Sequence, residues 1–183
     1  MADIMRALRS SGRQERCGPR AARIVAAILA CALFLSPGVA TTARAAAALP
    51  GAADLAADGA AAKDLHLPIL LFFNRVGCPY CERALREYLT PMQRDPANAN
   101  RVLFRQVETD QSYRLVDFSG SVTTHRKFAS RYKIQLTPTI WLVDGDGNVL
   151  VEPIVGLRTV DFYGAYLDQA IADSLAKLRT AVQ

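Results

Sequence analysis

The sequence predicts an α/β domain whose central mixed sheet is covered by helices on both faces, with its elements in the order β-α-β-α-β-β-α. A few observations indicate this class. A continuous apolar run at residues 69–73 is typical of a strand buried on both faces of a sheet. Helical patterns alternate with further strand-like runs, and a turn rich in Asp and Gly separates the last two strands. We place this domain at residues 63–183.

The first elements alternate between strand and helix. The strand at 69–73 is followed by a helix over 78–89, where Pro79 is suited to the first turn. A second strand is expected over 102–107 and, after a polar insert, a second helix over 125–132. A strand, a helix and a parallel strand in succession form the unit from which such sheets are built.

The remaining elements complete the sheet and cover it. Two β-rich runs, 139–143 and 149–151, flank the segment 144–148, which predicts a hairpin turn. A final amphipathic helix is expected over 160–178. Its buried face is expected to hold Phe162, Tyr166, Leu167, Ile171 and Leu175.

Residues 1–45 have the pattern of a cleavable secretory signal peptide. Arginines dominate residues 1–23, an apolar run occupies 24–35, and Ala43-Arg44-Ala45 fits a cleavage site. We expect cleavage after Ala45 and export to the periplasm. The apolar run is shorter than the roughly 20 residues that span a bilayer, so an uncleaved anchor is the less favoured alternative. No membrane span is expected after cleavage.

The chain that follows the expected signal peptide is close to neutral. The whole chain carries a net charge of +5, and residues 1–45 account for it with seven arginines and two acidic residues. The remainder has fifteen basic and fifteen acidic residues, which gives no indication of a nucleic-acid partner or an anionic membrane surface. Its first part, residues 46–62, is mostly Ala, Gly and Asp and predicts a flexible lead-in with a possible short helix over 53–63.

The cysteines point to redox chemistry. Cys17 and Cys31 fall in the expected signal peptide, so the exported domain keeps only Cys78 and Cys81. A single close pair does not stabilise a scaffold as the several disulfides of small secreted proteins do. Cys78 stands where a strand passes into a helix, and the helix N-terminus stabilises a thiolate there. We therefore expect a redox-active disulfide in which Cys78 attacks and Cys81, one turn further on and more buried, resolves.

A second element is Thr137-Pro138-Thr139 at the start of the third strand. The start of a strand is one of the few places where a cis X-Pro bond is tolerated. A CxxC motif after an apolar strand, with this tripeptide ahead of a β-hairpin, resembles the thioredoxin superfamily. The resemblance implies a thioredoxin fold in which Pro138 is cis and faces Cys78, while the backbone of Thr137 pairs with an extended substrate. Pro79 and Tyr80 would then also contact the substrate.

Within the superfamily, the chain is similar to periplasmic thioredoxin-like proteins associated with bacterial sulfur oxidation. The similarity extends over residues 63–177. It rests on Gly77 to Cys81, on Asp117 to Gly120, and on Leu136 to Thr139 leading to Asp146-Gly147. One residue departs from thioredoxins proper, which carry a buried Asp where this chain has Phe72. Proton transfer must therefore differ from theirs.

The resemblance implies a thiol–disulfide oxidoreductase that reduces disulfide-bearing protein clients and needs no cofactor. A membrane thiol–disulfide reductase would return electrons to the cysteine pair. The two residues between the cysteines do not fix the direction of electron flow, so a disulfide oxidant and an isomerase stay open as alternatives. A copper-delivery or client-binding protein on the same fold is a further alternative. The insert at 110–122 is expected to serve client recognition.

The histidines are expected to have no chemical role. His125 lies beside Arg126 and Lys127, which predicts a solvated helix face, and His66 lies at the entry to the first strand. A zinc site would need both histidines at spacings unlike those of common zinc modules. A copper-delivery site would need a histidine after the Thr-Pro element, and His125 precedes it. We therefore expect no metal.

Overall fold

The computed structural model describes residues 48–180. The expected signal peptide, residues 1–45, lies outside the described residues, as do the first residues of the expected lead-in. Among the helices of the described part, none combines the length and apolar character that crossing a membrane requires.

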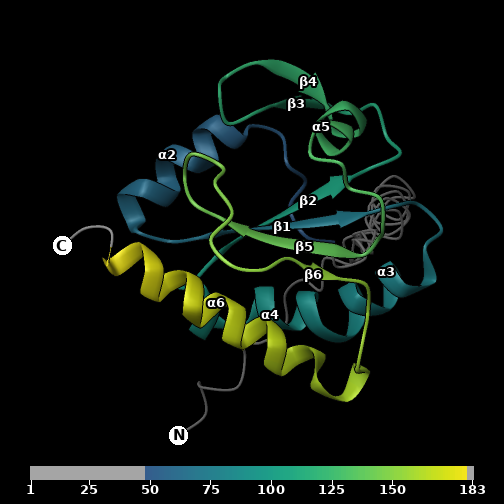
Figure 1. The fold of residues 1–183 in the computed structure, drawn as a ribbon, viewed down its shortest axis with the longest axis vertical. Helices are drawn as coiled ribbons and strands as arrows, with labels where there is room; N and C mark the ends of the chain where they lie inside the picture. Colours follow the sequence, from purple (N-terminus) through teal and green to yellow (C-terminus); the bar gives the residue numbers. More distant parts are fainter. Residues whose placement is uncertain (1–47, 181–183) are drawn as a thin grey trace, which may run out of the picture. The chain divides into compact units, whose positions relative to one another are not determined.

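Four strands form the central sheet in the order β2-β1-β5-β6 (Figure 1). β1 (Ile69–Asn74) lies in the middle and pairs in parallel with β2 (Leu103–Glu108) and antiparallel with β5 (Thr139–Val143). β6 (Ile154–Val155) pairs antiparallel with β5 and forms one edge. The mixed sheet confirms the predicted α/β class with a central mixed sheet.

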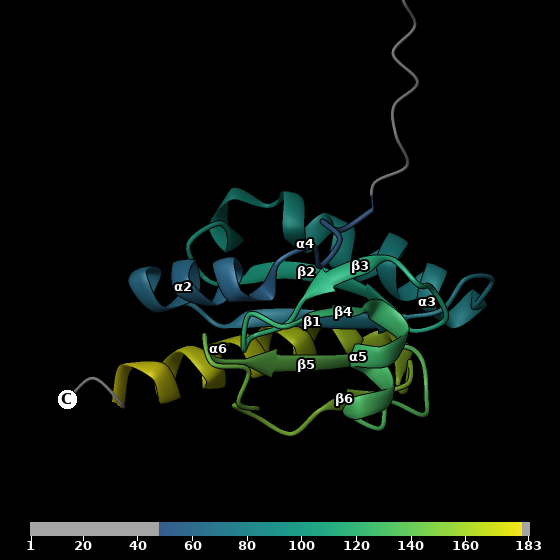
Figure 2. The same ribbon diagram turned by 90° about the horizontal axis from the view of Figure 1, so that it is seen from above.

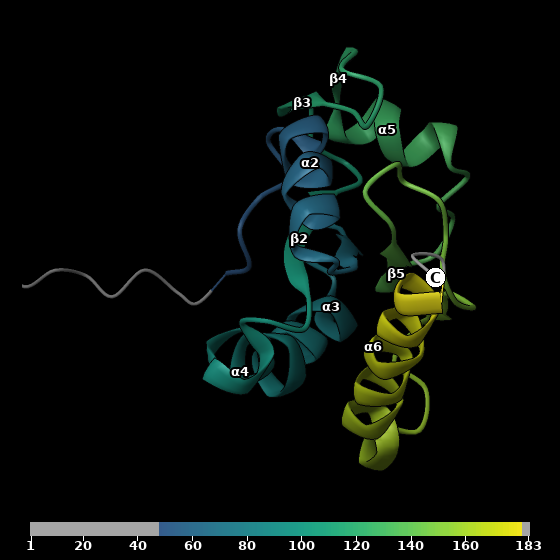
Figure 3. The same cartoon turned by 90° about the vertical axis from the view of Figure 1, so that its left-hand side faces the viewer.

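Helices cover both faces of the sheet, as Figures 2 and 3 show. α3 (Pro79–Ala84), α4 (Thr90–Arg94) and α6 (Tyr163–Thr180) lie on one face. α2 (Leu55–Leu65) and α5 (His125–Arg131) lie on the other. The sheet is therefore shielded on both sides, as the continuous apolar run of β1 predicts.

β1 supplies side chains to two hydrophobic cores. Successive residues of a strand point to opposite faces. Leu70 and Phe72 enter the core beneath α3 and α6. Ile69, Leu71 and Phe73 enter the core beneath α2 and α5. All five side chains are fully buried or nearly so, which fixes the position of β1 between the two helical layers.

The helix after the CxxC motif is longer than predicted and changes its winding. Helical residues continue to Arg94, with a π-helical segment, η1 (Leu85–Leu89), between α3 and α4. Pro91 accounts for the change, because it has no N–H to donate and its ring would clash with the carbonyl four residues earlier. In the wider π turn the N–H of Thr90 bonds to the Leu85 carbonyl, so the chain admits the proline without ending the helix.

The second strand of the predicted hairpin is displaced. β5 has its predicted bounds, and the turn after it is held by hydrogen bonds to the Asp144 carboxylate. The run 149–151 forms only an isolated bridge, between Val149 and Val143, so the prediction of a strand there is wrong. Pairing with β5 resumes at β6, after Pro153, which has no N–H to donate to the ladder.

The final helix begins later than predicted and buries a different stripe. α6 follows a short 3-10 helix, η3 (Val160–Phe162). The buried stripe contains Tyr163, Leu167, Ile171 and Leu175. Phe162 and Tyr166, predicted to be buried, are 59% and 53% exposed because they lie beside this stripe and not on it. Burial also raises the pKa of Tyr163.

Residues 49–54, before α2, pack against the sheet, where a flexible lead-in was predicted. The N–H of Ala52 donates to the Gln106 carbonyl at 2.9 Å, and the N–H of Gln106 donates to the Pro50 carbonyl at 2.8 Å. Leu49 and Ala52 are buried. This segment therefore extends the sheet at the outer edge of β2, and the predicted short helix follows it as α2.

His125 is buried, which corrects the prediction of a solvated face. It is 5% exposed, its Nδ1 accepts a hydrogen bond from the N–H of Glu108 at 3.0 Å, and its Nε2 lies 2.9 Å from the Ala52 carbonyl. A backbone N–H can only donate and a carbonyl can only accept, so the proton of a neutral ring lies on Nε2. The imidazole thus joins the end of β2 to the segment before α2.

The insert has a structure of its own. β3 (Arg114–Val116) and β4 (Val122–Thr124) form a second, antiparallel sheet. In the turn between them, Asp117 is 2% exposed and accepts hydrogen bonds from the hydroxyl and N–H of Ser119 and from the N–H of Ser121. The guanidinium of Arg131 on α5 pairs with the same carboxylate at 2.6 Å. Asp117 therefore ties the insert to α5.

The Asp117 contacts predict a loss of stability in acid. The Ser119 hydroxyl above all, and then Arg131, hold the pKa of Asp117 at about 2, against an ordinary value of 3.8. A lowered pKa in the folded state adds stability that is complete above pH 4 or so and is lost as the pH falls toward about 2. The free energy of unfolding of Asp117→Asn, relative to wild type, should therefore be much lower at neutral pH and should converge toward wild type near pH 2. Asp173→Asn, on an exposed face, is the control, and parallel pH profiles for wild type and Asp117→Asn would contradict the assignment.

His125→Ala is expected to lower the free energy of unfolding by about 2 to 4 kcal/mol. The substitution removes both ring hydrogen bonds and leaves a cavity in place of the imidazole. Denaturant titration measures the effect. His66→Asn serves as the control: His66 is exposed at the end of α2 with a φ of 54°, a conformation that Asn tolerates, so the change should stay within about 0.5 kcal/mol. Equal losses of unfolding free energy in the two variants would show that the hydrogen bonds of His125 do not stabilise the fold.

Candidate active site

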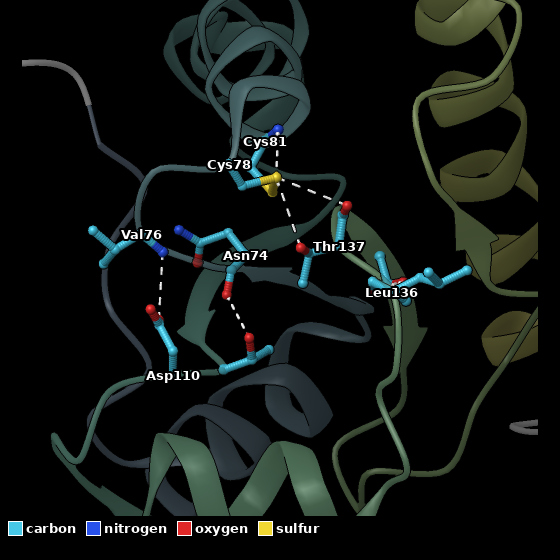
Figure 4. The surroundings of a disulfide bond; sticks show 9 residues. Asn74, Val76, Cys78, Cys81, Asp110, Leu136 and Thr137 are labelled. Atoms are coloured by element: carbon cyan, nitrogen blue, oxygen red, sulfur yellow. Dashed lines mark hydrogen bonds between the residues drawn. A yellow bond between two sulfur atoms is a disulfide. The ribbon is translucent and has the colours of Figure 1, made fainter.

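Cys78 and Cys81 are joined by a disulfide at the junction between β1 and α3 (Figure 4). Their Cα atoms are 5.2 Å apart, within the range of ordinary disulfides. Cys78 is the N-cap of α3, and its Sγ accepts a hydrogen bond from the N–H of Cys81 at 3.2 Å. The predicted pairing across one helical turn is confirmed.

The position of Cys78 suits a thiolate. Pro79 occupies the first turn of α3, so the chain enters the helix directly after the cysteine. The backbone N–H that reaches Cys78 Sγ would remain available to a negative sulfur once the disulfide opens. Both cysteines are buried, with Cys78 6% and Cys81 3% exposed. Tyr80, between them in the sequence, is 65% exposed.

The Thr137–Pro138 peptide bond is cis and lies against the disulfide. The Thr137 carbonyl oxygen is 3.8 Å from Cys78 Sγ, and the Thr137 hydroxyl donates to the same sulfur at 3.7 Å. The Pro138 carbonyl accepts a hydrogen bond from the N–H of Gly156 at 2.7 Å. The expectation that Pro138 is cis is therefore confirmed, and the residue before it faces Cys78 Sγ.

The surroundings of the disulfide are mainly apolar. Phe72, which stands in place of the carboxylate of thioredoxins proper, is fully buried in the same core as the cysteines. Asn74, at the end of β1, has a buried side-chain oxygen with no hydrogen-bond partner among the described residues. Besides the N–H of Cys81, the Thr137 hydroxyl is a polar group in hydrogen-bond contact with Cys78. Phe72 therefore offers no carboxylate for proton transfer at this position.

Contacts from the end of β2 and the start of the insert support the loop before Cys78, and the sequence does not reveal them. The N–H of Val76 donates to the Asp110 carboxylate at 3.4 Å. The carbonyl of Asn74 accepts hydrogen bonds from the N–H and the hydroxyl of Thr109 at 2.8 and 3.0 Å. Figure 4 shows Asp110 beneath the Val76 backbone on the side away from the sulfurs. The chain that leaves β2 thus holds the active-site loop in place.

Three large apolar side chains are exposed around the disulfide. Val76 precedes Cys78 and is 63% exposed, Tyr80 lies between the cysteines, and Leu136 next to Thr137 is 61% exposed. Isolated exposed apolar residues are common, but a group of them around a reacting bond forms a surface that a partner can cover. We name Val76, Tyr80 and Leu136 the apolar rim.

The histidines do not join the cysteines. Both ring nitrogens of His125 are engaged by the backbone at Glu108 and Ala52. His66 is exposed at the end of α2. Within residues 48–180, no cluster of three or more His, Cys, Asp or Glu side chains has the arrangement of a metal site.

Comparison with known proteins identifies the family. A family model described as a thioredoxin-like domain matches residues 55–171. Among solved structures, a poplar thioredoxin h mutant superposes with a TM-score of 0.50 at 15% identity, over 72% of this chain and 88% of that one. Mitochondrial thioredoxin 3 from Saccharomyces cerevisiae, in its oxidized form, gives 0.47 at 18% identity, over 68% and 94% of the two chains.

The C-terminal domain of DsbD from Neisseria meningitidis, in its oxidised form, gives a TM-score of 0.41 at 21% identity, over 66% of this chain and 98% of that one. No curated protein matches the chain. At these identities the structures show the fold alone, whereas the family model covers well over half of the chain, including both cysteines and the cis-proline. With its CxxC pair joined as a disulfide, the chain belongs to the thioredoxin-like domain family of the thioredoxin superfamily.

Proposed function

We propose that this protein is an exported thiol–disulfide oxidoreductase that reduces disulfides of protein clients. The observation that carries the proposal is the contact between Cys78 Sγ at the start of α3 and the backbone of Thr137 beside the cis-proline. This contact places the reacting sulfur next to a main-chain segment that an extended client can pair with. Pro79 and Tyr80 would contact the client from the α3 side.

The reaction proceeds by two thiol–disulfide exchanges. The thiolate of reduced Cys78 attacks one client sulfur, the client S–S bond breaks, and the departing sulfur takes a proton from solvent. Cys81, once deprotonated, attacks Cys78 Sγ and displaces the second client sulfur, which is also protonated. The client gains two electrons and two protons, and the protein is left with the Cys78–Cys81 disulfide. A membrane thiol–disulfide reductase would then return the electrons.

The expected signal peptide supports a periplasmic location, since arginines, an apolar run and a cleavage site follow one another in residues 1–45. The stretches 77–81, 117–120 and 136–139 support a place among the periplasmic thioredoxin-like proteins associated with bacterial sulfur oxidation. The middle stretch forms the turn in which Asp117 ties the insert to α5. In this proposal the insert positions the active-site loop through Asp110 and presents the adjacent surface to the client.

Cys78→Ser should abolish the reduction of insulin by the protein with dithiothreitol as electron donor, because the nucleophile is lost. Cys81→Ser keeps the nucleophile. Reduced beforehand and mixed with insulin in the absence of dithiothreitol, it should accumulate a mixed disulfide with the client, visible as a covalent adduct on non-reducing gels. Arg179→Ala, at the far end of α6, is a control that should retain full activity. Full activity of Cys78→Ser would refute the mechanism.

The reduction potential of the Cys78–Cys81 pair should lie near that of thioredoxin, about −270 mV. Equilibration of the domain with glutathione and dithiothreitol buffers, followed by thiol alkylation, measures it. A potential near about −120 mV would make the protein an oxidant of folding clients. If no disulfide formed in the most oxidising buffer, cysteines acting as metal ligands would become the better account.

A further inference from the structure

Edge strand β6 has a hollow on each of its faces. The α6-side hollow has a volume of about 510 Å³, and among its lining residues are Pro153, Val155, Gly156, Arg158, Tyr163 and Tyr166. The α5-side hollow has a volume of about 290 Å³, and among its lining residues are Tyr132, Leu136, Thr139, Trp141, Pro153 and Val155. Pro153 and Val155 line both, so β6 separates the two hollows.

β6 is an open edge within the described part of the chain. It is last in the strand order, whereas the opposite edge, β2, is extended by the segment before α2 (Figure 2). The N–H of Gly156 donates to the Pro138 carbonyl, so these two residues form a hydrogen-bonded pair between β6 and β5. Hydrogen-bonded and non-hydrogen-bonded pairs alternate along an antiparallel ladder, so the next pair, Val155 and Thr139, is non-hydrogen-bonded. The N–H and C=O of Val155 therefore point away from β5, toward the edge.

The edge is continuous with the disulfide site. Leu136 of the apolar rim lines the α5-side hollow, together with Thr139 just after the cis-proline. Gly156 lines the α6-side hollow, and its N–H is hydrogen-bonded to the Pro138 carbonyl. A chain that passes Cys78 along Thr137 therefore reaches β6 without leaving the surface of the protein.

The two hollows cannot be filled by one compact ligand, because β6 stands between them. An extended polypeptide can fill both, since its successive side chains point to opposite faces. We propose that β6 and its hollows bind the extended segment next to the client's reactive cysteine, with two adjacent apolar side chains entering one hollow each. The inference rests on the proposed function and deepens it, because it makes extended polypeptide disulfides, and not small disulfides, the preferred substrates.

The test uses synthetic peptides whose single cysteine is linked to thionitrobenzoate, with pre-reduced protein in single turnover. Attack of Cys78 on the peptide sulfur releases the coloured thionitrobenzoate thiolate, and Cys81 then frees the peptide thiol, so the two electrons come from the protein. Peptides of equal composition carry Phe and Leu either adjacent or separated by one Ser, on either side of the cysteine. Adjacent placement should raise the second-order rate constant about tenfold on one side of the cysteine, while separated placement directs both side chains to one face and should gain no more than about threefold.

Tyr166→Ser probes the α6-side hollow, because Tyr166 lines it and is 53% exposed, so that its loss should leave the fold intact. The ratio of the rates for adjacent and separated peptides should fall to near one in this variant. Leu65→Ser is the matched control, since Leu65 on α2 is 59% exposed and lines neither hollow, and the ratio should persist. A ratio unchanged by Tyr166→Ser would overturn the inference.

Dithiobis(nitrobenzoate), a small disulfide, separates the inference from the proposed function. If the reduced protein cleaves this reagent and all peptides at rates independent of their sequence, the role of β6 is refuted and the oxidoreductase proposal stands. If it cleaves neither the reagent nor any peptide, the oxidoreductase proposal itself fails, and the inference fails with it.

Discussion

The register between β1 and β5 is the constraint on which the disulfide site depends. Phe73 stands opposite Thr139, so the end of β1 and the start of β5 meet at one point of the sheet. β1 continues into the loop of Cys78, and β5 follows directly on Pro138. A slip of one residue would turn the apolar side chains of β1 to the wrong faces, so burial on both sides holds the register. The same burial therefore keeps the Thr137 carbonyl within 3.8 Å of Cys78 Sγ.

A second layer of support comes from the chain that leaves β2. Thr109 and Asp110 bond to the backbone on either side of Arg75, and the insert that follows is fixed to α5 through Asp117 and Arg131. The active-site loop is thus held from the insert as well as from the sheet. This arrangement gives the insert a structural role, because its first residue bonds to the backbone of the loop that precedes Cys78.

Features with a local cause could be predicted from the sequence, whereas features that depend on distant partners could not. The run of β1, the CxxC motif and the cis-proline each carry their signal in a few neighbouring residues. His125 was expected to be solvated because Arg126 and Lys127 adjoin it. Its ring is buried, and it is hydrogen-bonded to the backbone of Glu108 and Ala52 from other parts of the chain. Likewise, the small residues before α2 show no periodicity, and the stripe of α6 depends on where the helix begins, which the preceding 3-10 turn decides.

The pairing of the segment before α2 with β2 determines where the folding unit starts. The boundary expected at residue 63 falls inside α2, so a protein produced from there would lack Leu49, Ala52 and Leu55, all of them buried. It would also leave the imidazole of His125 without its acceptor and the edge of β2 uncovered. A truncated protein made for experiments should therefore begin before Leu49, so that the pairing of this segment with β2 is kept.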